Sequence, residues 1–578
     1  MEFEQKAEEK KMSMSKNIAR LAVTAGLTAA LSFGGVMAPV TMAFAAEGAT
    51  TANGSVTIEN VEGNTTEFKG YQIFKADVAT NGTVSNITWA NTNVQNAVES
   101  FIQAEDESYE GKTAQDAADW ITKKVEGTGK TTRVEFGSIP YKIADKVDGL
   151  TESATTTGKT VSGLEHGYWL FVTDPDTIET GDAGTSPIFT VVGSAPVKIT
   201  EKTGIPTVEK KIVSDADGLE HDAADSQIGQ DVTYNLYGTI AENFDKYGTY
   251  FYQFSDQISK GLTLQEGAKV YLYKNKDDAK ADSARTKGTD ITTNFSKSTD
   301  PAAEDGSITT KWTCDDLKTV KDVTKDSYIV VSYTARINEH AIVAGTESNN
   351  NAVILKYSNN PMDKESKGQT PPDTVKDYTY GLRINKVDLG TEAKLPNAQF
   401  TITTKGDKDN EQVKYVDDKG KLSANEVILK TGNDGVITLT GLDAGVYTVK
   451  EVSAPDGYTA VDSFTFTIKP TMTDDGPAAG LTKVTGELKT SQNTKVIAGL
   501  NDTSAGKVGD NKLDFKEGTL TNSDGTFNIT VGDTKQVGLP LTGLNGVTFT
   551  WIAGGAVLCI GVAHLIRSRK QAEESEQE

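Results

Sequence analysis

The chain has 578 residues, with 58 lysines and arginines against 81 acidic residues, so its formal net charge at neutral pH is −23. A chain this acidic lacks the basic face that binding to a nucleic-acid backbone requires, which argues against that class of function. Its four histidines show no metal-ligand spacing, and no metal or cofactor is expected. Of the two cysteines, Cys559 lies in an apolar C-terminal run and Cys314 stands alone, so an exported and processed chain has no internal disulfide.

The N-terminal segment is typical of a secretory signal peptide. Lys16 and Arg20 precede an apolar run over residues 21–40, and residues 43–45 (Ala-Phe-Ala) supply the small residues of a cleavage site. We therefore predict export with residues 1–46 removed. The remaining length is enough for about three domains.

Residues 47–202 are predicted to form a first unit that combines strands and helices. Runs rich in β-branched and aromatic residues predict strands at 55–58, 70–74, 168–172 and 188–192. Apolar residues at helical spacing predict helices around 94–102 and 114–121, the second with Thr113 as its N-cap. Both helices are expected to pack on the β core.

Residues 197–202, which read V-K-I-T-E-K, are expected to close this first unit. Val197 and Ile199 alternate with polar residues, as in a half-buried last strand. Lys202 follows near the end of that strand.

A second unit is predicted over residues 203–365, and its opening strand carries an unusual lysine. Alternation places Val208, Lys210 and Ile212 on one face of the strand and Lys211 on the other. A lysine that shares a face with two apolar residues lies at a domain edge or extends its charged end toward water.

A third unit is predicted over residues 377–537, after a linker at 366–376 whose lysine, glycine and proline content favours an extended connection. Its first strand repeats the pattern of the second unit, because Leu382, Ile384 and Lys386 share one face. The two units therefore each begin with a strand that turns a lysine toward apolar residues.

The C-terminal end carries the string Leu539-Pro540-Leu541-Thr542-Gly543. The apolar segment 544–566 follows and would rise roughly 34 Å as a helix, enough to cross a bilayer. The basic run 567–570 (R-S-R-K) would then stay on the cytoplasmic side. This order resembles the cell-wall sorting signal of Gram-positive surface proteins, in which a sortase cleaves between Thr542 and Gly543 and joins the threonine carbonyl to an amine; residues 538–578 would form that signal.

The chain as a whole resembles the sortase-assembled shaft pilins of Gram-positive bacteria. Their shaft subunits carry a V-x-V-Y-P-K motif at the end of the first domain, and Lys202 takes the place of its lysine, although Thr200 and Glu201 replace the Tyr-Pro pair. The resemblance implies a mainly β fold of tandem immunoglobulin-like, collagen-adhesin-type sandwiches, the first with helical insertions. It also implies that Thr542 of one subunit becomes bonded to Lys202 of the next.

In the second unit the resemblance implies a covalent lysine–asparagine bond. Residues 254–262 resemble the family's F-x-D-x-L-S-K-G-L segment, and residues 351–361 resemble N-x-V-x-L-x-Y-S-N-N-P. Carried over, Lys210 is the nucleophile, Asn351 the acceptor and Asp256 the proton-transferring acid, with Lys211 as an alternative to Lys210. Burial disfavours charge, so a neutral amine can attack the amide while the acid assists, and ammonia is released.

In the third unit the resemblance is to the collagen-adhesin B-type domain. A strand ending in Glu451 precedes residues 454–458 (A-P-D-G-Y), and the resemblance implies that Glu451 promotes bond formation by Lys386. The acceptor is Asp533, which stands where the family has an asparagine and would lose water in place of ammonia, or else Asn528. The first unit has Thr173 where the acid would stand, so no internal bond is expected there.

Two classes of function remain after this reading. The first is a structural subunit of a covalent surface pilus, with a class C pilin sortase, a housekeeping sortase, identical subunits and peptidoglycan as partners. The second is a wall-anchored monomeric adhesin that binds a host protein or glycan. An enzyme is not expected, because outside the cross-link candidates no nucleophile–base set, metal cluster or phosphate loop is evident in the sequence. Lys202 discriminates the two, since only a polymerising subunit needs an acceptor amine between its first two units.

Overall fold

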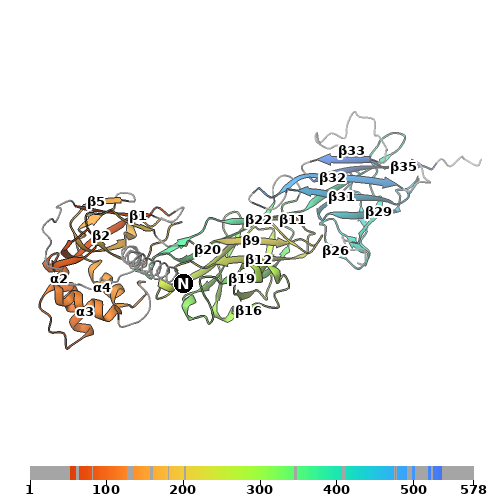
Figure 1. Ribbon diagram of the computed structural model, residues 1–578. Helices are drawn as coiled ribbons and strands as arrows, with labels where there is room; N and C mark the ends of the chain where they lie inside the picture. Colours follow the sequence, from red (N-terminus) through yellow and green to blue (C-terminus); the bar gives the residue numbers. More distant parts are fainter. Residues whose placement is uncertain are drawn as a thin grey trace, which may run out of the picture.

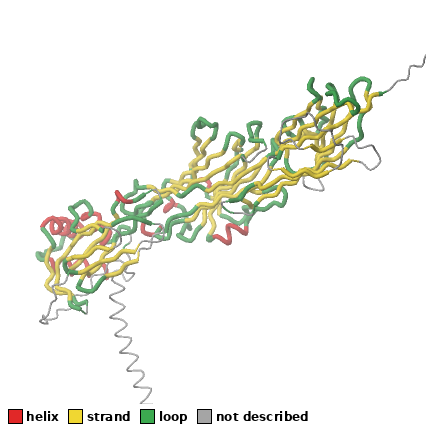
Figure 2. The backbone as a smooth tube through the Cα atoms, turned by 90° about the horizontal axis from the view of Figure 1, so that it is seen from above, coloured by secondary structure: helices red, strands yellow, loops and turns green. Residues whose placement is uncertain are grey.

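The computed structural model describes residues 53–536, apart from 60–63, 81, 127–133, 135, 157–159, 180, 201–203, 344–347, 406–411, 474–475, 477, 491–497, 502–517 and 523–524. Figures 1 and 2 show three units that follow one another along an elongated molecule, with most of the helices in the first unit at one end. The expected mainly β fold with tandem sandwiches is confirmed.

The first unit packs two sheets and three helices in layers. One sheet has the order β5 (Thr160–Leu164), β1 (Gly54–Glu59) and β8 (Val197–Thr200). The other has the order β3 (Val84–Trp89), β2 (Phe68–Val78), β6 (Gly167–Thr173) and β7 (Ile188–Val192), with β4 (Ala154–Thr155) on β2. The helices are α2 (Thr92–Glu105), α3 (Ala114–Glu126) and α4 (Ile139–Val147).

Strand β6 lies at the centre of the first unit and is buried on both faces. Its residues Leu170 and Val172 join the core that the helices cover, whereas Trp169 and Phe171 join the core between the two sheets. The predicted helices thus pack on the β core as expected, and Thr113 caps α3 by accepting the Asp116 N–H at 3.2 Å. The α4 helix was not predicted from the sequence.

The middle unit is a sandwich of two seven-stranded sheets. In the first the order is β10 (Glu220–His221), β9 (Val208–Val213), β12 (Asp231–Thr239), β19 (Tyr328–Ile337), β15 (Lys269–Tyr273) and β16 (Thr289–Asp290), with β14 (Leu262–Leu264) on β19. In the second it is β11 (Ala223–Asp225), β22 (Asp373–Tyr378), β20 (Asn349–Ser358), β13 (Tyr252–Ile258), β18 (Ile308–Cys314) and β17 (Ser296–Thr299), with β21 (Lys367–Gln369) on β20. The short helix α5 (Lys276–Ala281) lies beside the first sheet.

The third unit is a sandwich of a five-stranded and an eight-stranded sheet. In the smaller sheet the order is β28 (Val436–Leu442), β23 (Tyr380–Asp388), β35 (Thr526–Lys535) and β30 (Tyr458–Thr459), with β33 (Ala498–Asn501) on β35. In the larger it is β26 (Leu422–Ser423), β25 (Lys414–Val416), β24 (Gln399–Thr404), β29 (Gly445–Ser453), β31 (Phe464–Met472), β32 (Leu481–Thr490) and β34 (Gly518–Asn522), with β27 (Leu429–Lys430) on β24.

The expected linker at 366–376 is wrong. This segment contains β21 and most of β22, and β22 pairs with both β20 and β11 inside the middle unit. Val375 is buried in the middle core, so the polar residues around it are the outward-facing positions of a strand rather than a solvated connection. Because β22 ends at Tyr378 and β23 begins at Tyr380, the middle and third units are joined with a single residue between strands.

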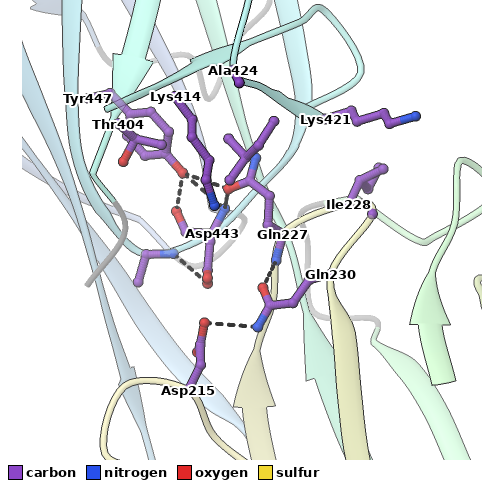
Figure 3. A pocket seen from close by; sticks show the side chains of 13 residues that line it. Asp215, Gln227, Ile228, Gln230, Thr404, Lys414, Lys421, Ala424, Asp443 and Tyr447 are labelled. Carbon is purple, nitrogen blue, oxygen red and sulfur yellow. Dashed lines mark hydrogen bonds between the residues drawn. The ribbon is translucent and has the colours of Figure 1, made fainter. Parts of the chain in front are cut away.

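Hydrogen bonds also join the middle unit directly to the third unit that follows it. The Ile228 N–H donates to the Gly441 carbonyl at 3.0 Å, and the Asp443 N–H donates to Gln227 Oε1 at 3.2 Å. Gln227, Ile228 and Asp443 line a cavity of about 480 Å³ between the units, shown in Figure 3. The Tyr447 hydroxyl also contacts Gln227 Oε1 there, at 3.3 Å, so polar groups of the two units bond to one another across the cavity wall.

At its other end the middle unit contacts the first unit through the Asn-Asn-Pro segment that follows β20. The Gly184 N–H donates to the Asn359 carbonyl at 2.5 Å, and the Tyr141 hydroxyl donates to the Pro361 carbonyl at 2.8 Å. Both joints therefore use backbone groups in addition to side chains, which favours a fixed arrangement of the three units.

Candidate functional site

Within the described ranges two lysines are completely buried, one in the core of each sandwich that follows the first unit. Lys210 lies on β9 between the apolar positions Val208 and Ile212, as the alternation predicted. Its side chain has no exposed surface, so the expectation of a domain edge or of a charged end extended toward water is wrong. A buried ammonium is strongly disfavoured unless charged and polar groups surround it. The contacts of each lysine therefore decide what the site can do.

Lys210 Nζ contacts residues from both sheets of the middle unit. It donates to Asp256 Oδ1 on β13 and to Asn351 Oδ1 on β20, both in the sheet opposite β9. Strands β13 and β20 are antiparallel neighbours, with Asp256 beside Val353 and Ile258 beside Asn351, so the acid and the amide lie two positions apart on the same inward face. The structure thus brings together Lys210, Asp256 and Asn351, all of which are buried.

The charge on Lys210 is weakened by its surroundings. Burial lowers the pKa of Lys210 from its ordinary value of 10.5 to about 8, although the attraction of Asp256 opposes this shift. A neutral amine in contact with an amide is a nucleophile close to its electrophile.

Lys211, the alternative nucleophile, points the other way. Its Nζ pairs with Asp222 Oδ1 at 2.7 Å near the surface of the middle unit. Since successive side chains on a strand face opposite sides, Lys211 has no route to Asn351.

Tyr333 is a member of this cluster that the sequence analysis missed. It lies on β19, its side chain is buried, and its hydroxyl contacts Asp256 Oδ2 at 2.5 Å, Asn351 Nδ2 at 2.7 Å and Lys210 Nζ at 3.0 Å. The strand alternation around Tyr333 marks it only as a core residue. Nothing in the sequence indicates where its hydroxyl points.

In the third unit, Lys386 Nζ contacts two carboxyl groups. It donates to Glu451 Oε2 at 2.9 Å and to Asp533 Oδ1, and all three side chains are fully buried. Strand β23 pairs in parallel with β35, so Lys386 and Asp533 come from neighbouring strands of one sheet, and Glu451 reaches them from β29 in the other. The Val461 N–H also donates to Glu451 Oε2 at 2.9 Å and holds this carboxyl in place.

Two carboxyl groups around one ammonium leave an excess negative charge if all are ionised. Burial raises the pKa of Asp533 from 3.8 to about 7, and the attraction of Lys386 only partly opposes the shift. Near neutral pH, Asp533 is therefore protonated in a larger fraction of molecules than an exposed carboxyl is, and in that form its carbonyl carbon is a better target for an amine than a carboxylate would be.

Asn528, the alternative acceptor, lies on the opposite face of β35. Phe527, Ile529 and Val531 face the core together with Asp533, whereas Asn528 is register-paired with Arg383 on the other side of the sheet. It is therefore not placed to react with Lys386.

The remaining site predictions fall on the first unit or outside the described residues. In the first unit, Thr173 is buried, and its hydroxyl accepts the Thr185 N–H at 3.0 Å, a structural hydrogen bond. Lys202 lies outside the described residues, as do Leu539, Pro540, Thr542 and Gly543. Within the described ranges no helix is long and apolar enough to span a membrane, and the expected span at 544–566 is not among them.

Comparisons with known proteins point to surface proteins of Gram-positive bacteria. The model of a family described as the SpaA prealbumin-like fold domain matches residues 381–483, in the third unit. The chain is 24% identical over 416 residues to the "Trypsin-resistant surface T6 protein" of Streptococcus pyogenes serotype M6, which covers 64% of this chain and 70% of that protein.

The solved structures that match the chain include the following two pilins. The T6 backbone pilin of serotype M6 Streptococcus pyogenes is 17% identical, covers 84% of this chain and 99% of its own, and has a TM-score of 0.47. The full-length major pilin SpaD from Corynebacterium diphtheriae is 16% identical, with coverages of 84% and 98% and a TM-score of 0.43. The chain is thus similar in sequence to a streptococcal surface protein, and its third unit matches the SpaA prealbumin-like domain.

Proposed function

We propose that this protein is the backbone subunit of a covalently polymerised pilus on the surface of a Gram-positive bacterium. The observation that carries the proposal is the pair of buried lysine clusters, because each sets an amine against a carboxyl or amide carbon with an acid within hydrogen-bond distance. Similarity to the T6 surface protein supports the same function.

In this proposal each cluster forms one isopeptide bond in a single reaction, and the bond then remains. Lys210 bonds to Asn351 with Asp256 as the acid, and ammonia leaves; Lys386 bonds to Asp533 with Glu451 as the acid, and water leaves. The protein is its own substrate, so it is not an enzyme in the usual sense.

The positions of the two bonds suit a subunit that is pulled along its length. Lys386 and Asp533 lie on the first and last strands of the third unit, just before the sorting motif, and Lys210 lies on the first strand of the middle unit, just after Lys202. If Thr542 is joined by a pilin sortase to Lys202 of the next subunit, tension passes through the middle and third units and leaves the first unit aside. A housekeeping sortase would join the final subunit to peptidoglycan.

Replacing the proposed acceptor tests polymerisation directly. Lys202→Ala should abolish the high-molecular-weight ladder that survives boiling of wall extracts in SDS, while monomer remains on the wall. The matched control is Lys198→Ala, which removes a nearby exposed lysine on β8 that pairs with Glu59. A ladder that persists in Lys202→Ala would contradict the acceptor assignment, and a wild-type chain without any ladder would favour the monomeric adhesin.

A further inference from the structure

Among the residues that the structure describes, the Tyr333 hydroxyl contacts all three members of the middle cluster, Lys210, Asp256 and Asn351. It accepts from Lys210 Nζ and Asn351 Nδ2, and it donates to Asp256 Oδ2. A tyrosine hydroxyl has one proton to donate and two lone pairs to accept with, so these three contacts use its full hydrogen-bonding capacity.

The Tyr333 hydroxyl also lies between Asp256 and the amide nitrogen of Asn351, which would leave as ammonia. Asp256 Oδ1 accepts from Lys210 Nζ, and Asp256 Oδ2 is occupied by Tyr333. In the described part of the chain, no hydrogen bond that we find runs directly from Asp256 to Asn351. The path from the carboxyl group to the amide nitrogen therefore passes through the Tyr333 oxygen.

We propose that Tyr333 is a catalytic residue of the middle unit, which passes a proton from Asp256 to the departing nitrogen of Asn351. This role rests on the proposed function, because it requires that the Lys210–Asn351 bond forms. An amide nitrogen leaves as ammonia only after it gains a proton, so delivery to Nδ2 is a necessary step.

The reaction balances with the groups present. The Lys210 ammonium first passes a proton through the Tyr333 hydroxyl to Asp256 Oδ2, and the neutral amine attacks Asn351 Cγ while the carbonyl electrons move to Asn351 Oδ1. Tyr333 then gives its proton to Nδ2 and regains one from Asp256 Oδ2, while Asp256 Oδ1 takes a proton from the newly bonded Lys210 nitrogen. When the electrons on Asn351 Oδ1 return to the carbon, the Cγ–Nδ2 bond breaks and ammonia leaves. The ammonia takes the proton from Asp256 Oδ1 and departs as ammonium.

The surroundings of Tyr333 hold the relay in place. Its ring stacks between Trp312 and Tyr234, at centroid distances of 5.4 and 5.5 Å. Burial raises the pKa of Tyr333 well above its usual value of 10, so the hydroxyl keeps a proton and exchanges one for another. Because the ring is held in place, the transfer requires only that the hydroxyl turn its proton from Asp256 toward Asn351 Nδ2.

The experiment follows both cross-links in one full-length chain. The chain is collected unfolded in guanidinium, before either bond has formed, and diluted into buffer; portions are quenched at intervals and digested. Mass spectrometry then measures the bonded fraction of the Lys210–Asn351 and Lys386–Asp533 peptides. Tyr333→Phe keeps the aromatic ring and removes only the hydroxyl, so the Lys210–Asn351 bond should form at least about 100-fold more slowly, at the lower end of general acid–base contributions.

Two controls separate catalysis from packing. The Lys386–Asp533 bond should form at its wild-type rate in Tyr333→Phe, which shows that the third unit refolds and that the slowing is confined to the middle unit. Tyr252→Phe removes another buried hydroxyl from the same core, one that donates to the Thr239 carbonyl at 2.7 Å, and should leave both rates unchanged.

Each outcome decides the question. A Lys210–Asn351 rate in Tyr333→Phe equal to the wild-type rate would overturn the relay and leave the cross-link standing. Equal slowing in Tyr333→Phe and Tyr252→Phe would show that buried hydroxyls act through packing, and would also overturn it. A wild-type chain that never forms this bond would refute the cross-link itself, and the relay with it.

Discussion

The middle and third units place a lysine in the same kind of position and surround it differently. In the middle unit Lys210 faces Asp256 and Asn351 across the sandwich, so a bond would join the two sheets. In the third unit Lys386 and Asp533 lie on adjacent parallel strands, and only Glu451 comes from the opposite sheet. The Lys210–Asn351 bond would therefore join the two sheets of the middle unit, whereas the Lys386–Asp533 bond would join two strands of one sheet in the third unit.

The acceptors also differ, and the neighbouring acids differ with them. Asn351 must lose a nitrogen that carries no acidic proton, and a tyrosine hydroxyl lies between it and the acid. Burial raises the pKa of Asp533 to about 7, so its carboxyl group carries a proton of its own in part of the molecules near neutral pH. The comparison teaches that the leaving group, more than the lysine, determines which additional residue a cluster needs.

The largest expected effect comes from removing one acid at a time. A bond that closes a loop of roughly 140 residues stabilises a unit by about 5 kcal/mol in the chain-entropy treatment, and Asp256→Ala should remove this contribution from the middle unit alone. Glu451→Ala should do the same for the third unit. Chemical denaturation followed by unit-specific proteolysis checks this, and a variant that weakens both units equally would contradict separate clusters.

The next prediction concerns how the rate of Lys210–Asn351 bond formation depends on pH. Whether this rate falls or rises with pH distinguishes two mechanisms. Lys210 carries a proton below its pKa of about 8 and loses it above that pH. Because the reaction needs that proton for the leaving nitrogen, the rate of Lys210–Asn351 formation should be constant up to about pH 8 and then fall about tenfold per pH unit. The refolding assay with quenched samples measures it; a rate that rises through pH 8 would mean that only the free amine matters.

A smaller effect is expected for the alternative acceptor in the third unit. Asn528→Ala should leave the Lys386–Asp533 peptide fully bonded, because Asn528 lies on the opposite face of β35. Peptide mapping checks this directly. Loss of the bonded peptide in Asn528→Ala would show that the acceptor has been assigned to the wrong residue.

The smallest effect on cross-linking is expected for Lys211→Ala, the neighbour of the proposed nucleophile. This change removes a largely buried ion pair with Asp222, which should cost about 1–3 kcal/mol, and leaves the Lys210–Asn351 bond intact. A denaturation midpoint and the mass of the bonded peptide test both parts. Disappearance of the bond would reverse the roles of the two lysines.

Alternation in the sequence was sufficient to predict which face of its strand each site lysine occupies. A period of two on β9 and β23 set which lysine faces the core, and the resemblance supplied partners that lie far away in sequence. The Tyr333 contact could not be predicted, because it depends on how β19 packs against the opposite sheet. The prediction of a linker at 366–376 was wrong for a related reason. It was based on the proline, glycine and charged residues of the segment, whereas β22 is held by backbone hydrogen bonds to the strands on either side of it.

The measurement that tests the account most directly is the intact mass of the folded chain without its signal peptide and sorting signal. Loss of one ammonia and one water predicts a mass about 35 Da below the sequence mass, with about 17 Da restored by Asp256→Ala and about 18 Da by Glu451→Ala. The first unit should contribute nothing to the deficit, since Thr173 stands where an acid would be needed. A wild-type mass equal to the sequence mass would contradict both covalent bonds.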